Sequence, residues 1–183
     1  YDCAICNFDY EFLLNDDSIF QFSFKNDELR YAFIQNPYIY ISKEEYVTTI
    51  FTQEEVSEIN NIDVLADLID ENEYEQFLNE QELNSISNYI RYDTSLSGYK
   101  ALNHSYSHIH IGLNPDMRVP LSIILTPLKF IKFCIKTSYY RYWQKAFILI
   151  PNFENTLKVS KNKCLNLDRT HWNIKEEYDL YIK

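Results

Sequence analysis

Glycine is scarce in this sequence, which holds only 2 glycines and 5 prolines in 183 residues. Loops that cradle a nucleotide phosphate use several glycines, and neither the P-loop pattern nor the dinucleotide-binding fingerprint occurs. The Gly-x-Ser-x-Gly nucleophile elbow is also missing. The scarcity therefore argues against ATP- and NAD-dependent chemistry, and it leaves no flexible glycine-rich linker.

Long apolar runs are absent as well. The most apolar stretch, from Leu121 to Phe133, falls short of the roughly 18 apolar residues that cross a membrane, because Pro127 and two lysines interrupt it. A chain that begins at Tyr1 can lack its true N-terminus, but no secretory signal pattern is found. We therefore expect a cytoplasmic protein without membrane contact.

The cysteines form no disulfide pattern. Cys134 lies in an apolar helical pattern, where a small buried thiol is common. Cys3 and Cys6 form a lone Cys-x-x-Cys without the second pair that many zinc sites use, so lining the core is favoured over binding zinc. We expect these cysteines and Cys164 to be reduced.

Charge is distributed unevenly along the chain, whose formal net charge is −10. Residues 44–90 contain 13 acidic and no basic residues, whereas residues 100–183 contain 13 basic and 6 acidic residues. An acidic run is usually a solvated face, and the alternatives are a cover for the basic half or a docking face for a protein partner. One half of the molecule is thus acidic and the other basic.

The length suits one domain with its own hydrophobic core, so we expect a single α+β domain over residues 1–183. Alternating phenylalanines around the turn 25–28 predict a β-hairpin from Ser18 to Tyr38. Five more strands are expected, at 89–94, 108–113, 119–125, 147–150 and 156–159. The expected architecture is a mainly antiparallel sheet, with a histidine-bearing hairpin, packed against amphipathic helices.

Capping signals predict where the helices begin. Ser42 with Glu45 forms a capping box for a helix through Phe51, and Thr52 with Glu55 forms a second capping box. Apolar spacing predicts two short helices in the acidic stretch, around 64–69 and 74–78. A helix is expected from Thr126-Pro127 to about Lys145, with a core stripe of Leu128, Ile131, Ile135, Tyr139, Tyr142 and Ala146.

Polar groups that can carry chemistry gather between residues 91 and 118. Because side chains alternate along a strand, Arg91 and Asp93 share one face of their strand, and His108 and His110 share one face of the next. Ile109 and Ile111 supply the opposite, apolar face, so the histidine face is either solvated or a site. His104 and Arg118 join this set from the flanking segments, while His171 stands alone.

Two chemistries suit this set of residues. In the first, histidines act as general base and acid, Asp93 orients an imidazole, and Arg91 and Arg118 stabilise the charge of a phosphodiester under attack, without a metal cofactor. In the second, Asp93, His108 and His110 bind a divalent metal such as Zn that activates water, as in a metal-dependent hydrolase. A third possibility is purely structural, in which Asp93 pairs with Arg91 and one histidine bonds a backbone carbonyl. The protein would then be a non-catalytic interaction subunit.

A basic stripe follows the histidine segment, and we expect it to lie beside the candidate site. Lys129, Lys132 and Lys136 share one face of the expected helix, and such a stripe concentrates positive potential. We expect it to bind substrate, with RNA or an acidic protein as the partner, although a solvated face is the plainer alternative.

Several segments together resemble a known family. They are Tyr89-Ile-Arg-Tyr-Asp93, the stretch from His104 to Gly112 with its His-x-x-x-His-x-His-x-Gly pattern, Arg118-Val-Pro120, and Thr126-Pro127-Leu-Lys-Phe130. In order and spacing they resemble the bacterial family called domain of unknown function 2290. The resemblance implies a bacterial, cytoplasmic protein, and a remoter similarity to small toxins implies a nuclease-type effector in a toxin or phage-defence setting.

Overall fold

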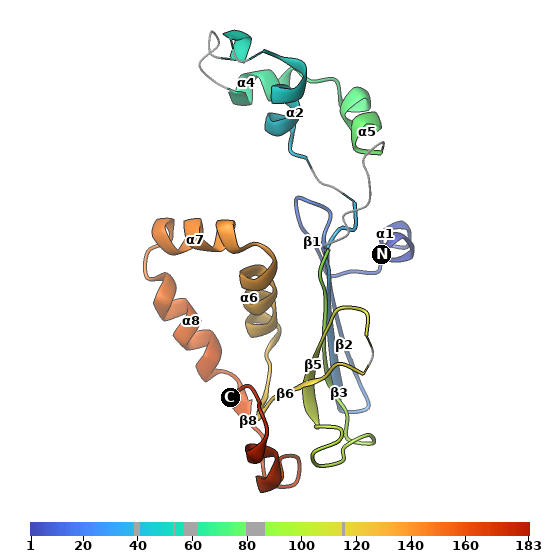
Figure 1. Ribbon diagram of the computed structural model, residues 1–183, viewed down its shortest axis with the longest axis vertical. Helices are drawn as coiled ribbons and strands as arrows, with labels where there is room; N and C mark the ends of the chain where they lie inside the picture. Colours follow the sequence, from blue (N-terminus) through green and yellow to red (C-terminus); the bar gives the residue numbers. More distant parts are fainter. Residues whose placement is uncertain (39–40, 53, 57–61, 80–86, 115) are drawn as a thin grey trace. The chain divides into compact units, whose positions relative to one another are not determined.

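The computed structural model describes residues 1–38, 41–52, 54–56, 62–79, 87–114 and 116–183 (Figure 1). The chain divides into two compact units, one of Tyr1–Gln35 with Asn88–Lys183 and one of Asn36–Ser87. A division by contacts does not tell whether each unit folds alone, so the expected single domain stays a prediction.

The larger unit is built on a six-stranded antiparallel sheet with the strand order β1-β2-β3-β4-β5-β6. The strands are β1 Phe12–Leu13, β2 Ile19–Lys25, β3 Glu28–Ile34, β4 Tyr89–Thr94, β5 Ser107–Ile111 and β6 Val119–Pro120. Together with the helices, this sheet confirms the predicted α+β class and its mainly antiparallel character.

The hairpin predicted between Ser18 and Tyr38 is confirmed as β2 and β3. Asn26 and Asp27 form its two-residue turn with φ of 53° and 63°, between the paired residues Lys25 and Glu28. Two consecutive positive φ values match the twist of the flanking strands, and Asn and Asp tolerate them better than most residues.

One face of the sheet packs against α6, which spans Pro127–Ser138 (Figure 1). The ring of Phe130 lies 5.6 Å from that of Tyr31 and 6.3 Å from that of Phe20. The buried core also includes Phe33, Ile90, Tyr92, Ile109, Leu121, Ile123, Leu125 and Cys134. Since side chains alternate along a strand, the residues between these core positions project from the opposite face of the sheet.

The expected strand 119–125 is wrong as one continuous strand. Only β6 joins the main sheet, and β7, Ile123–Ile124, pairs with β8, Leu165–Asn166, in a separate two-stranded sheet. Between β6 and β7, Leu121 forms an isolated β-bridge with Ile182, and the amide of Ser122 donates to the Ile182 carbonyl at 3.0 Å. The amide of Leu121 still donates to the carbonyl of Ser107 at 2.9 Å, so the chain leaves the main sheet after Leu121.

The single helix expected up to Lys145 is two helices, α6 and α7, Tyr140–Leu149. Tyr139 interrupts them with φ −125° and ψ 50°, and its hydroxyl bonds Asp16 and Ser18. Beyond this interruption Tyr142 is exposed, and Leu128 at the start of α6 is exposed as well, so the predicted core stripe is wrong at these two residues.

The strands expected at 147–150 and 156–159 are wrong. Residues 147–149 belong to α7, and residues 156–159 belong to α8, Phe153–Asn162. A short apolar run looks alike in a buried strand and in a helix, and here the run Phe147-Ile-Leu-Ile150 is exposed.

The smaller unit contains α2 Lys43–Ile50, α4 Ile62–Asp67 and α5 Glu71–Asn79, which confirms the helices predicted there. The Ser42–Glu45 capping box forms, and Thr52 and Glu55 bond reciprocally. Residues 53, 57–61 and 80–86 of this segment lie outside the described part of the chain.

The remaining elements lie at the two ends of the chain. They are α1, Asp2–Cys6, and the short 3-10 helix η1, Ile174–Tyr178. Cys3 and Cys6 are exposed on α1, so the expectation that they line the core is wrong, whereas all four cysteines are free, as predicted. Among the described residues, every helix is too short or too polar to cross a bilayer.

Candidate functional site

Strand register builds the site on the sheet face opposite α6. Asp93 on β4 lies directly across from Arg30 on β3 and from His108 on β5, and Arg91 lies directly across from His110. These five residues form two adjacent rows. We call the surface that they form the histidine face.

Asp93 is the centre of the charged contacts. Its carboxylate accepts hydrogen bonds from Arg30 Nε at 2.9 Å and from Arg91 Nε at 2.6 Å, and it lies 3.4 Å from His110 Nε2. Asp93 is only 6% exposed, and a buried carboxylate needs such partners to offset its lost hydration. The predicted Asp93–Arg91 pair is therefore present, and Arg30 joins it.

The three histidine rings pack edge to face, one after another. The ring centroids of His104 and His108 are 4.9 Å apart, and so are those of His108 and His110. His108 is 2% and His110 is 3% exposed, so these two imidazoles are not solvated surface groups. The side chains expected to carry chemistry thus lie close together. His104 contacts His108, His108 contacts His110, and His110 lies beside Asp93.

His108 has a defined tautomer. Its Nδ1 lies 2.8 Å from the carbonyl oxygen of Ser105, which can only accept a hydrogen bond. Nδ1 must therefore carry the proton, and in the neutral ring the Nε2 lone pair is free to accept a proton or bind a metal ion.

Burial keeps both strand histidines neutral. It lowers the pKa of His108 to about 4, and the bond to the Ser105 carbonyl opposes this effect only in part. Burial also lowers the pKa of His110, the charge of Arg91 adds to the effect, and Asp93 opposes it. Burial tends to lower the pKa of Arg91, but the pairing with Asp93 outweighs it and the net change is upward.

Within the described part of the chain, the buried nitrogens Arg118 Nε and His104 Nδ1 have no hydrogen-bond partner. Arg118 is near enough to His110 for its charge to lower that pKa. It also lines a small hollow of about 90 Å³ together with Ser105, Pro120 and Glu176. Pro120 pairs with His108 across β5 and β6, so this hollow adjoins the histidines.

A metal ion would find three ligands here. One ligand atom from each of Asp93, His108 and His110 lies within 4.8 Å of the others. Neutral imidazoles and a carboxylate are ligands that zinc takes, and a ligating histidine commonly donates its other N–H to a carbonyl, as His108 does to Ser105.

The lysine stripe does not lie beside the histidines. Lys129, Lys132 and Lys136 are on α6, which packs on the other face of the sheet, and Lys132 Nζ donates to the carbonyl of Thr156 on α8 at 2.8 Å. Their role in binding substrate stays a prediction, but the expected place next to the site is wrong.

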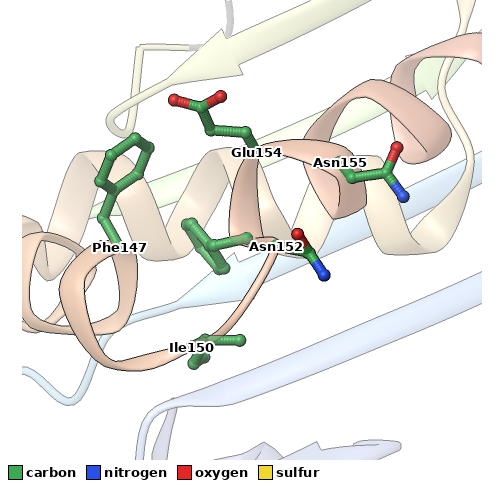
Figure 2. A pocket seen from close by; sticks show the side chains of 6 residues that line it. Phe147, Ile150, Asn152, Glu154 and Asn155 are labelled. Atoms are coloured by element: carbon green, nitrogen blue, oxygen red, sulfur yellow. The ribbon is translucent and has the colours of Figure 1, made fainter.

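A larger hollow, of about 320 Å³, lies at the turn between α7 and α8 (Figure 2). Phe147, Ile150 and Phe153 line it with the polar side chains of Asn152, Glu154 and Asn155. One carboxylate among amides and apolar groups offers no acid and base pair, so this hollow is not a candidate active site.

Two site residues were not identified from the sequence. Arg30 gave no local signal, because only the β3–β4 register brings it to Asp93. Glu176 is 2% exposed and bonds Ser105, and the Asn173-x-x-Glu176 capping box could have placed it at a helix start but not beside a histidine.

A comparison with family models adds one finding. The model described as "Uncharacterized conserved protein (DUF2290)" matches residues 1–177. The chain belongs to this family. The DUF2290 match extends well beyond the segments between residues 89 and 130 that carry the resemblance in the sequence, and it covers residues of both compact units, Glu176 among them. Neither the curated proteins nor the solved structures contain a match.

Proposed function

We propose that this DUF2290 protein cleaves phosphodiesters, with RNA as the expected substrate, at the histidine face. The observation that carries the proposal is the charge around His108 and His110. Three guanidiniums, those of Arg30, Arg91 and Arg118, outnumber two carboxylates. Asp93 holds the first two, and Asp116 lies 3.9 Å from Arg118, while burial keeps both imidazoles neutral. The site is therefore cationic, and it favours an anionic group such as a phosphate.

The roles of the residues follow from their contacts. The free Nε2 of His108 takes the proton of the attacking hydroxyl, and the guanidiniums stabilise the charge that develops on the phosphoryl oxygens. Asp93 holds Arg30 and Arg91 and faces His110. Since both its oxygens are engaged, we assign it the role of an anchor and not of a base.

The acid that protonates the leaving oxygen needs an imidazolium. Burial disfavours that form of His110, as its lowered pKa indicates. A bound phosphate anion would favour it, because an opposite charge nearby stabilises the charged form. We therefore expect the acid to form in the substrate complex, from His110 or His104.

A metal-dependent hydrolase is the second candidate, favoured by the convergence of Asp93, His108 and His110. In that scheme the ion lowers the pKa of a bound water, and the arginines still hold the phosphate. The two guanidiniums on Asp93 oppose a cation at this position, which is why we rank this candidate second.

The test is cleavage of a single-stranded RNA by the purified protein, before and after a chelator. The first candidate predicts the same rate in both, and the second predicts loss with the chelator and recovery on adding Zn²⁺. A DNA of the same sequence tests whether RNA is preferred. Failure of the protein to cleave either strand, with or without Zn²⁺, would overturn both candidates. A bacterial toxin or phage-defence role and a cytoplasmic location remain predictions.

A further inference from the structure

Glu176 is a buried acid outside the cluster already described. It lies on η1 near the C-terminus and is 2% exposed. Its Oε1 accepts from the hydroxyl of Ser105 at 2.9 Å, and its Oε2 accepts from the hydroxyl of Tyr99 and from the amide of Asn173, each at 2.9 Å. Three donors from two distant segments thus converge on one carboxylate.

Ser105 connects this carboxylate to the histidine face. Its side chain is held by Glu176, and its carbonyl oxygen accepts from His108 Nδ1 at 2.8 Å. Ser105 lies outside β5, so the ladder of the sheet does not fix it. The residues on either side are fixed, because Tyr106 accepts from the amide of Ser95 and His104 bonds Lys100. The Glu176 contact holds the side chain between these two anchored positions.

We infer that Glu176 is a positioning residue, which fixes the orientation and the tautomer of His108 through Ser105. A carboxylate suits this position because it only accepts, and all three of its neighbours donate. A glutamine would turn an N–H₂ toward at least one donor. The inference about the tautomer stands on geometry alone, and its consequence for catalysis rests on the proposed function.

The experiment compares three variants that remove different parts of this arrangement. Ser105→Ala deletes the link and keeps the bonds of Glu176 to Tyr99 and Asn173. Tyr99→Phe is the matched control, since it also removes one hydroxyl from Glu176 but keeps the Ser105 link. Glu176→Ala removes all three hydrogen bonds of the carboxylate and carries the greatest risk of unfolding. The comparison of Ser105→Ala with Tyr99→Phe therefore decides whether the inference holds.

The readout is the ¹⁵N spectrum of the imidazole nitrogens of His108, which separates the two neutral tautomers. In the unmodified protein and in Tyr99→Phe, we expect the proton on Nδ1. Ser105→Ala keeps the backbone carbonyl but frees it from the Glu176 contact. The ratio of the Nδ1–H to the Nε2–H form should therefore fall, by about fivefold to tenfold if the carbonyl turns away and the whole His108 hydrogen bond is lost. An unchanged ratio in Ser105→Ala, or an equal fall in Tyr99→Phe, would overturn the inference.

Cleavage rates give the second readout. If the proposed function holds, kcat/KM should fall in Ser105→Ala and stay within about twofold in Tyr99→Phe, since the base needs its free Nε2. If no RNA is cleaved by any form, the proposed function fails while the tautomer measurement still decides the role of Glu176.

Discussion

At the scale of single residues, Asp93 and His108 have different roles. Asp93 is surrounded by Arg30, Arg91 and His110, so its charge organises other groups. His108 is the opposite case, because its Nδ1 donates to the Ser105 carbonyl and its Nε2 has no hydrogen-bond partner among the described residues. The residue with the free lone pair is the one that can react.

The buried imidazole of His108 should make stability depend on pH. In the unfolded chain its pKa is near 6.5, and in the folded protein it is about 4. The unfolded state therefore binds more protons between these values, and stability falls as the pH falls through this window. The expected loss is about 3 kcal/mol of unfolding free energy in chelator-treated protein, measured by urea unfolding at several pH values.

The variant His108→Asn separates this effect from the other groups that face the ring, Asp93, His104 and His110. Its amide can still donate to the Ser105 carbonyl, but it does not titrate. His171→Asn is the control, because the His171 ring packs against Tyr106 and lies beside Asp168. The account fails here if His108→Asn and the parent lose the same stability on acidification.

At the scale of elements, the segment between β4 and β5 brings His104 to its neighbours. Gly98 makes room for it, since a Cβ at this position would lie 2.9 Å from His104 Cε1 and 2.9 Å from Ser95 Oγ. Only a glycine lets the ring lie so close to the backbone.

Gly98→Ala is therefore expected to displace the His104 ring. NMR contacts between the His104 and His108 rings should weaken, and the matched variant Gly112→Ala should leave them intact. A Cβ at Gly112 meets nothing within 4 Å, but its φ of 77° would cost about 1 kcal/mol of stability. Equal ring contacts in the two variants would show that Gly98 does not set the position of His104.

Local patterns were sufficient for the elements whose signals are local. The β2–β3 hairpin, the Ser42 capping box and the start of α6 at Thr126-Pro127 all followed from alternation or capping. The strand at 147–150 failed because four apolar residues in a row do not distinguish a strand from a helix, and the strand at 156–159 failed because the alternation Thr-Leu-Lys-Val is too short to do so.

The candidate site was predictable in part. Alternation placed His108 and His110 on one face, and Arg91 and Asp93 on one face of the neighbouring strand. Which faces coincide, and which helix covers the other side, depend on register and packing. Register places Arg30 beside Asp93, and packing places Glu176 beside Ser105 and the lysine stripe on the other face of the sheet. Sequence spacing alone predicts none of these positions.

At the scale of the whole molecule, the acidic residues 36–87 are an insertion between two paired strands. Ile34 of β3 pairs with Tyr89 of β4, and next to them the amide of Gln35 donates to the carbonyl of Asn88 at 2.9 Å. The two ends of the insertion therefore meet at one point of the sheet.

Replacing residues 36–87 by a short Asn-Gly turn should leave the larger unit folded, because β3 and β4 are antiparallel neighbours that such a turn can join. Circular dichroism, a cooperative thermal transition and the ¹⁵N spectrum of His108 measure this. Matching spectra would show that the larger unit folds alone. An unfolded product would instead support one indivisible domain.

The most direct test of the central claim compares kcat/KM for RNA cleavage by the parent and by His108→Asn. The substitution keeps a donor for Ser105 and removes the lone pair assigned to the base. We expect cleavage to fall by about 100-fold or more, the usual contribution of a general base, with an unchanged unfolding transition at pH 7. Cleavage at the parental rate by a folded His108→Asn protein would contradict the account, because the histidine face would then not be the active site.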